Sequence, residues 1–223
     1  MVLAPAQEEL GSKLGPFIFE FQRWGMEPAA FLDALDRFLG TLPPRPQYAT
    51  EVRNPAILGS RYLNILRTHN VSNVYNHWTA MPPLSEQHRL LDQTFTAPFV
   101  VFRLLTPLGL AYEKAVERYK PYDRIVQAQP RMRHEIGHDL AVQQSAAQGK
   151  SAYILVNNRS EGYSPLTIPG SRGSFGSERC RQGARPPVRD GSGLGRWRCA
   201  ELRPLPCRSS MTHVHNDIIL KYS

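Results

Sequence analysis

Apolar and amphipathic segments alternate along the first 168 residues of the chain. Five short apolar segments, rich in branched and aromatic side chains, are typical of buried β-strands. These predicted strands cover residues 15–22, 47–55, 71–78, 97–107 and 153–158. Amphipathic helices are predicted between them, as in residues 27–40, where Phe31, Leu35 and Phe38 fall at helical spacing on one face. Strands separated by helices pair in parallel through right-handed crossovers, so the pattern predicts an α/β fold.

Four further helices are predicted in the same way. They cover residues 57–68, 84–93, 111–126 and 132–147, and Pro130 divides the last two. The first four strands are thus each followed by at least one helix, as in β/α folds.

Polar side chains close each of the five predicted strands. They are Glu20 and Gln22 in the first strand, Glu51 and Arg53 in the second, Asn76, His77 and Trp78 in the third, Arg103 in the fourth, and Asn157 and Asn158 in the fifth. In a parallel sheet these carboxyl ends lie on the same side, where (β/α)8 barrels carry their active sites. We therefore expect an incomplete TIM-like barrel of about five parallel strands, with a candidate site on its rim. The alternative is that polar residues only mark the points where strands reach the surface.

The rim residues suit a small anionic or hydroxylated ligand, whose identity and reaction the sequence leaves open. Arg53 and Arg103 offer forked guanidinium donors for negative charge, and Glu51 is the candidate acid or base, so we predict these three as catalytic residues. Further polar side chains would orient the ligand through hydrogen bonds. They are Asn76, His77, Asn157, Asn158 and Glu161. The alternative for each arginine is an ion pair with a neighbouring carboxylate such as Glu51.

The composition changes sharply after the last predicted strand. Residues 169–210 show no helical or alternating period and are dominated by Arg, Gly, Pro and Ser, so we expect disorder in the basic tail, residues 169–223. The tail holds 10 Lys and Arg against 4 Asp and Glu, whereas residues 1–168, the predicted domain, hold 17 against 15. One interpretation is a nucleic-acid-binding tail, with Phe175 and Trp197 available to stack on bases. We favour the other, an out-of-frame reading of a GC-rich coding region, so nucleic acid is not an expected partner.

Several other functional classes lack support. No apolar run approaches the roughly 20 residues that a spanning helix needs, so no membrane partner is expected. The first residues lack the basic start and apolar core of a secretory signal, and we expect a cytoplasmic protein. The sequence contains no P-loop, no GxGxxG after a strand and no GxSxG, which argues against nucleotide-binding folds and hydrolases of these types.

The segment RMRHEIGHDL contains an HExxH pattern formed by His134, Glu135 and His138. On a helix the two histidines share a face and can bind Zn²⁺, with the glutamate as general base, so a zinc hydrolase is the alternative function. The extended pattern requires glycine at 141 and histidine at 144, where the chain has Ala141 and Gln144. We therefore favour a solvated helix face and expect no metal or other cofactor.

Four segments, LGPFIFEFQ, YATEVRNP, FVVFRLLTPLG and AYILVNNRSEGYSPLTI, resemble in their order the YecE-like family, the proteins with domain of unknown function seventy-two. The resemblance covers roughly residues 9–168. It implies a TIM-like barrel of uncharacterised function, with a shared cleft that the matching positions face. Those positions are Glu51, Arg53, Arg103, Asn157 and Asn158.

Members of this family begin with further βα units and end with a closing helix, and neither is recognisable in this sequence. The resemblance therefore implies a fragment of a barrel, with an exposed parallel strand at each edge of the sheet. Unpaired edges favour self-association, so a second copy of the chain is an expected partner beside the unknown small molecule.

Overall fold

The computed structural model describes residues 3–11, 14–22, 27–136, 148–167, 209–214 and 217–222 of the 223-residue chain. Its first elements are α1 (Leu3–Leu10), β1 (Phe17–Phe21), α2 (Pro28–Gly40), β2 (Tyr48–Val52), the 3-10 helix η2 (Pro55–Ile57), α3 (Ser60–Thr68), β3 (Ser72–His77) and α4 (Leu84–Leu90). They are followed by β4 (Phe99–Leu104), α5 (Tyr112–Tyr119), α6 (Pro130–His134), β5 (Ser151–Asn157), the 3-10 helix η4 (Asn158–Ser160), β6 (Ser209–Val214) and β7 (Asp217–Tyr222). None of the helices in these described ranges is long and apolar enough to cross a membrane.

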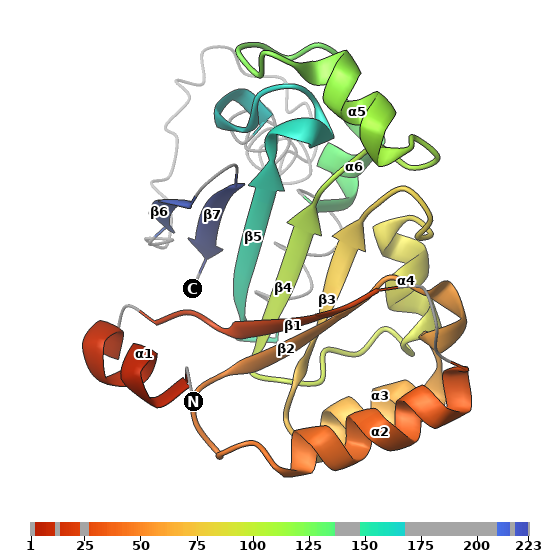
Figure 1. Cartoon of the computed structure of the whole chain (residues 1–223), viewed down its shortest axis with the longest axis vertical. Helices are drawn as coiled ribbons and strands as arrows, with labels where there is room; N and C mark the ends of the chain where they lie inside the picture. The colour runs from red at the N-terminus through yellow and green to blue at the C-terminus, as the bar shows by residue number, and fades with distance from the viewer. Residues whose placement is uncertain are drawn as a thin grey trace, which may run out of the picture.

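The strands form one seven-stranded sheet in the order β1-β2-β3-β4-β5-β7-β6. β1 to β5 pair in parallel and in chain order, whereas β7 pairs antiparallel with both β5 and β6. In Figure 1 the strands turn from nearly horizontal at β1 to nearly vertical at β5, so the sheet is strongly twisted. The five predicted strands and the α/β class are confirmed. Their consecutive order is that of barrel strands, but within the described residues the sheet stays open, because β1 pairs with β2 alone.

Side chains alternate between the two faces of the sheet and form two separate apolar clusters. The outer face packs against α2, α3 and α4. Its cluster includes Leu35, Tyr62, Leu66, Tyr75, Leu84, Phe102 and Ile154. The opposite face, which we call the inner face, is apolar near the amino ends of the strands. Its cluster consists of Ala49, Val74, Ala97, Phe99, Val101 and Tyr153, with Ile18 and Leu155 packed against it. By the same alternation Glu20, Glu51 and Arg103 lie on the inner face, closer to the carboxyl ends.

Prolines shift the bounds of two predicted helices. The helix predicted over residues 111–126 ends at Tyr119, because Pro121 has no backbone N–H to continue it and disfavours a helical residue before it. Pro130, predicted to separate two helices, instead lies in the first turn of α6, where its missing N–H costs nothing. The predicted helix over residues 132–147 lies outside the described residues beyond position 136.

The tail predicted over residues 169–223 is described only in β6 and β7, two strands that the sequence pattern did not predict. The predicted disorder of the remaining tail lies outside the described residues. β7 pairs along β5 from Ala152↔Tyr222 to Asn157↔Asp217. The prediction of an exposed parallel edge on each side is therefore wrong at β5, whose outer edge is occupied by β7.

Candidate functional site

Four charged side chains meet at the carboxyl ends of β1, β2 and β4. We call Glu20, Glu51, Arg53 and Arg103 the rim quartet. Arg53 contacts Glu20 through Nη2 at 2.8 Å and Glu51 through Nε at 3.1 Å. Arg103 Nη1 donates to Glu20 Oε2 at 3.0 Å and also to Glu51 Oε2. Each guanidinium therefore bridges both carboxylates, which makes a ring of alternating charge.

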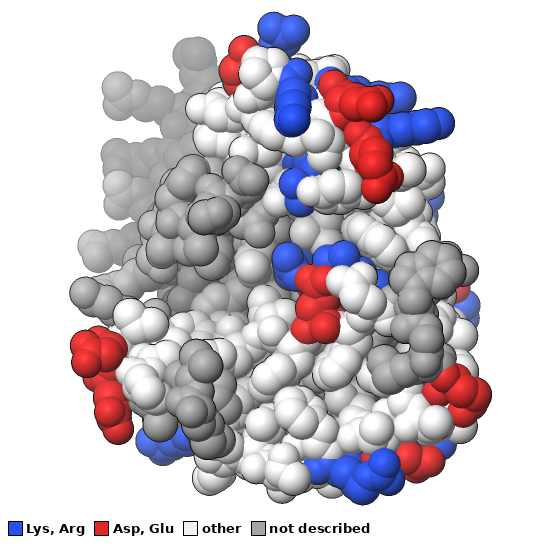
Figure 2. Space-filling view, in the orientation of Figure 1, with Lys and Arg blue, Asp and Glu red and all other residues white. Residues whose placement is uncertain are grey.

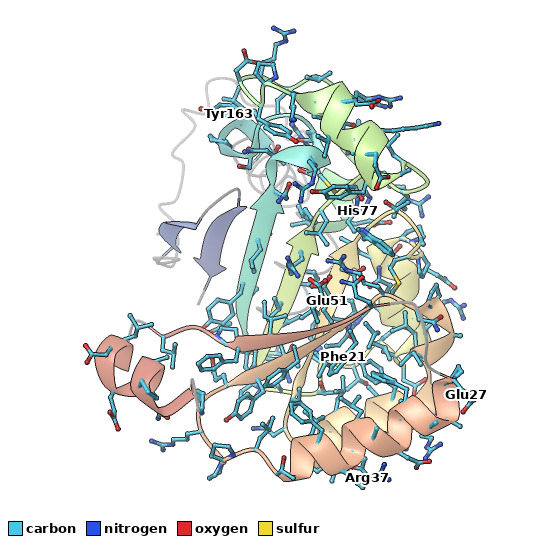
Figure 3. All side chains as sticks on the ribbon, in the orientation of Figure 1. Phe21, Glu27, Arg37, Glu51, His77 and Tyr163 are labelled. Carbon is cyan, nitrogen blue, oxygen red and sulfur yellow. The ribbon has the colours of Figure 1, made fainter. Side chains whose placement is uncertain are left out.

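Strand register explains why the quartet assembles. Glu20 and Glu51 lie directly opposite each other in the β1–β2 pair, where two like charges alone would repel. The arginines from β4 and the end of β2 neutralise this pair. In Figure 2 acidic and basic atoms meet near the centre of the face, over the ends of β1 and β2, and Figure 3 places Glu51 there. The surrounding surface is largely uncharged, so the quartet is a local feature of this face.

Most of the quartet is withdrawn from water. The Glu51 side chain is fully buried, those of Arg53 and Arg103 are 14% and 17% exposed, and that of Glu20 is 30% exposed. Burial alone would lower the pKa of the Arg103 guanidinium, but the Glu51 and Glu20 carboxylates outweigh it and raise that pKa above its usual value. Arg53 also lies over the Trp78 ring, 5.0 Å from its centroid. Arg103 is thus held charged, both arginines are held in place, and solvent reaches the quartet mainly at Glu20.

Asn76 extends the site from β3 as the register partner of Arg103. Its buried side chain donates from Nδ2 to the Val52 carbonyl at 3.0 Å. Asn76 Oδ1 and Arg103 Nε are both buried and have no hydrogen-bond partner among the described residues. Since buried polar atoms are nearly always paired in folded proteins, this acceptor and this donor are the unsatisfied hydrogen-bonding atoms of the site among the described residues.

His77, the next residue along β3, points to the opposite face of the sheet, because successive side chains alternate along a strand. Figure 3 shows His77 apart from Glu51. Its Nδ1–H donates to the Thr106 carbonyl at 3.0 Å. Burial lowers the pKa of His77, which favours the neutral imidazole. His77, which was predicted as a binding residue, therefore lies apart from the rim quartet.

Asn157 and Asn158 organise the turn that follows β5. Asn157 Oδ1 accepts from the Arg159 N–H at 2.9 Å and so caps η4. Asn158 Oδ1 accepts from the backbone N–H of Ser164 at 2.9 Å and from its hydroxyl at 2.8 Å. Both amide oxygens hold the loop together, which is a structural role that the sequence pattern did not distinguish from ligand binding.

Glu161 joins this turn to the connection between α5 and α6. Its fully buried carboxylate accepts from Arg133 Nε at 2.8 Å, from Arg133 Nη2 at 2.6 Å and from the Gln129 N–H at 2.6 Å. Its backbone carbonyl accepts from the N–H groups of Val126 and Gln127. These contacts belong to the α5–α6 connection and do not bring Glu161 to the rim quartet.

Glu135 of the HExxH pattern anchors the start of α4. Its carboxylate accepts from the Leu84 N–H at 3.1 Å and from the Ser85 hydroxyl at 2.9 Å. Glu135 is buried, so the expectation of a solvated helix face is wrong for this residue, although His134 is exposed. His138 lies outside the described residues. Within the part of the chain that the structure describes, no group of three or more His, Cys, Asp or Glu side chains could hold a metal ion.

Glu20 and Trp78 belong to the site, although they were predicted only as polar strand ends and not as site residues. Glu20 is the single charged residue in the segment FIFEF. Because side chains alternate along β1, Glu20 lies on the inner face, as Glu51 does on β2. The parallel pairing of β1 with β2 then sets the two residues side by side. A charged residue inside an otherwise aromatic strand was the available signal.

Comparison with known proteins identifies the family. A match to the family described as "Protein of unknown function DUF72" covers residues 3–187, which include the whole rim quartet. No curated protein and no solved structure shows significant similarity to the chain. The match extends beyond both ends of the range over which the four sequence segments resemble the YecE-like family. That resemblance is confirmed, and the chain belongs to the DUF72 family.

Proposed function

We propose that the rim quartet binds a small hydroxylated ligand without net charge. The bridging of two carboxylates by two guanidiniums is the observation that carries this proposal. Because the four charges balance, the quartet offers little net attraction to an anion. It does set hydrogen-bond acceptors and donors side by side. This suits neighbouring hydroxyl groups, since each hydroxyl both donates and accepts.

The surroundings of the quartet support the same ligand class. Glu20 is the most exposed member and is the point where solvent reaches the other three. Asn76 Oδ1 adds an acceptor and Arg103 Nε adds a donor that no described residue satisfies. A hydroxyl group can serve either atom, whereas a carboxylate or phosphate oxygen can serve only the donor.

Catalysis by Glu51, Arg53 and Arg103 remains a prediction from the sequence, as does the cytoplasmic location. Both oxygens of Glu51 already accept hydrogen bonds from guanidinium groups. For Glu51 to act as an acid or base, one of these guanidiniums would have to move away. Binding is the simpler role for the arrangement as it stands.

Replacing Glu20 with glutamine should weaken ligand binding by about tenfold or more, because the change removes a charged acceptor that orients both arginines. Thermal shift of the full chain with neutral polyols and sugars, such as myo-inositol and glucose, identifies a stabilising ligand. Calorimetric titration then compares its affinity for the wild type and the Glu20→Gln variant.

Glu86→Gln is the matched control for this test. Glu86 forms an exposed ion pair with Arg89 at 2.6 Å on α4, so its replacement should leave the affinity unchanged. The proposal fails if no polyol or sugar raises the melting temperature, or if the Glu20→Gln variant binds as tightly as the wild type. Stabilisation by inorganic phosphate or acetate that increases in Glu20→Gln would instead favour an anionic ligand.

We also propose that the chain self-associates through the outer edge of β1, which pairs with no strand of the described residues. Phe17 N–H donates to the Gln47 carbonyl, and the Phe21 carbonyl accepts from Arg53 N–H, so these positions turn their backbone groups toward β2. Because this direction alternates along a strand, Ile18 turns its N–H and C=O toward the open edge. A β-strand of a second copy could pair with these groups.

The Ile18→Pro variant should lose self-association and stay folded, because proline there removes only an outward N–H. Sedimentation velocity measures the association state, and circular dichroism checks the fold. Phe19→Pro is the matched control, since it removes a backbone N–H on the β2 side and should destabilise the sheet. A monomeric wild type at high concentration, or an Ile18→Pro variant that associates like the wild type, would contradict the proposal.

A further inference from the structure

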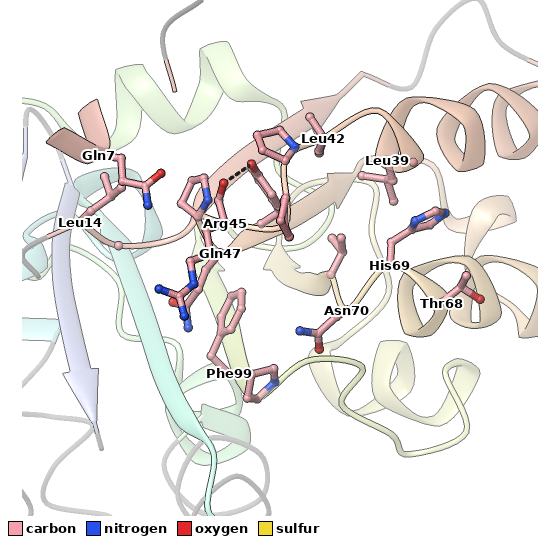
Figure 4. Close-up of a pocket in the computed structure, with 18 of the residues that line it drawn as sticks. Gln7, Leu14, Leu39, Leu42, Arg45, Gln47, Thr68, His69, Asn70 and Phe99 are labelled. Atoms are coloured by element: carbon pink, nitrogen blue, oxygen red, sulfur yellow. Dashed lines mark hydrogen bonds between the residues drawn. The ribbon is translucent and has the colours of Figure 1, made fainter. Parts of the chain in front are cut away.

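A cavity of about 600 Å³ lies at the end of the sheet opposite to the rim quartet. It is lined by residues that precede β1, β2, β3 and β4, together with parts of α1 and the connection from α2 to β2 (Figure 4). Its volume falls within the range of roughly 300 to 1,000 Å³ that is usual for small-molecule sites. Neither the family match nor the proposed function assigns a role to this cavity.

Stiff apolar residues form much of the cavity wall. Pro43, Pro44 and Pro46 come from the connection before β2, and Pro98 and Phe99 from the start of β4. Proline has a fixed φ and few soft torsions, so this part of the wall loses little freedom when a ligand binds. The wall therefore offers a preformed surface for a hydrocarbon group.

Basic side chains line the cavity without an acidic counterpart in the described lining. The described lining residues include one arginine and one histidine but no aspartate or glutamate. His69 Nε2 already pairs with Asp36 Oδ1 at 2.7 Å, outside the lining. The Arg45 guanidinium, in contrast, has no carboxylate partner among the described residues, and only its backbone carbonyl is engaged, by the Tyr48 hydroxyl at 3.2 Å. Arg45 is thus a cation available to a ligand.

Side-chain amides stand around the same space. They belong to Gln7, Gln47 and Asn70. Figure 4 shows Arg45, Gln47 and Phe99 close to one another along one side of the cavity, with Asn70 across from them. A charged donor and an aromatic ring therefore border one part of the space, and amide groups can add hydrogen bonds around it.

We infer that this cavity binds a small organic acid with one carboxylate and an apolar body. The carboxylate pairs with the Arg45 guanidinium, which can donate two parallel hydrogen bonds to it. The hydrocarbon part lies against Phe99 and the proline wall. A polyphosphate or nucleotide fits less well, because a single unpaired arginine balances only one negative charge.

Calorimetric titration of the full chain with benzoate, phenylacetate and cyclohexanecarboxylate tests this site. We expect at least one of these acids to bind and the matching neutral amide, such as benzamide for benzoate, to bind far more weakly. The Arg45→Gln variant should lose about tenfold to a hundredfold in affinity for the acid, because it loses a charge-assisted hydrogen-bonded pair.

Two control variants isolate the site. Arg61→Gln removes an exposed arginine that pairs with Asp33, and Arg89→Gln removes one that pairs with Glu86, both outside the cavity. Both variants should bind the acid as the wild type does. The rim quartet is unchanged in all of these variants, which keeps this test independent of the proposed function. The inference is overturned if none of the three acids binds, if the acid and its amide bind equally, or if Arg45→Gln binds with unchanged affinity.

Discussion

Replacing Gly162 with alanine should lower the free energy of unfolding by about 3 kcal/mol or more. Gly162 has a φ of +115°, which a residue with a Cβ adopts only with strain. A Cβ at this position would lie 2.5 Å from the Arg124 carbonyl oxygen and 2.9 Å from the Val126 nitrogen. Both are backbone atoms of the α5–α6 connection, so they cannot rotate aside. Urea denaturation of the two proteins measures the difference.

Gly109→Ala is the matched control for Gly162→Ala. Gly109 also has a positive φ, +75°, but a Cβ there would meet nothing within 4 Å. Its replacement should therefore cost only the backbone strain, about 1 kcal/mol. Equal losses at the two positions would show that the close approach of residues 124–126 to Gly162 has no energetic importance.

Replacing Arg133 with methionine should lower the free energy of unfolding by about 3 kcal/mol, because it leaves the buried Glu161 carboxylate without its charged partner. The Glu161 side chain is fully buried and Arg133 is 18% exposed, so little water can replace the lost guanidinium. Among the residues that the structure describes, only the Gln129 N–H would still donate to the carboxylate. Thermal and urea denaturation should both show the loss.

Arg131→Met is the control for Arg133→Met, on the same helix. Arg131 is 73% exposed and contacts Glu135 at 3.1 Å, so its loss should cost about 0.5 kcal/mol. If the loss in Arg133→Met comes from the uncompensated charge, adding Glu161→Gln should recover part of it. Equal effects of the two arginine variants, or no recovery in the double variant, would argue against a buried charge pair at Arg133.

Much of the fold could be predicted from the sequence because the strands and helices have distinct apolar periods. The strands β4 and β5 contain the apolar runs FVVF and YILV, as buried parallel strands do, and their positions were predicted to within a few residues. The prediction failed where the order of apolar and polar residues has no regular period. β6 and β7 lie in a region of mixed composition, and their pairing with β5 is a contact between distant parts of the chain.

Part of the candidate site could also be predicted from the sequence, because its residues lie at the ends of the predicted strands. Glu51, Arg53 and Arg103 are brought together, because parallel strands carry their carboxyl ends to one side. The ion pairs with Glu51, which were the alternative prediction for both arginines, are present. His77 and Asn76 are neighbours in sequence, yet they point to opposite faces, and only Asn76 extends the quartet.

The sequence by itself determined the α/β class, the five parallel strands and the family, since these depend on local periods and on short segments in a fixed order. Only the tertiary structure decided which polar residues act together. The strand register sets Glu20 beside Glu51. Loops and helix ends are held instead by four other polar residues, Asn157, Asn158, Glu161 and Glu135. A polar residue at the end of a strand looks the same in sequence whether it binds a ligand or its own backbone. The difference lies in which atoms are within hydrogen-bond distance, and that depends on contacts between segments far apart along the chain.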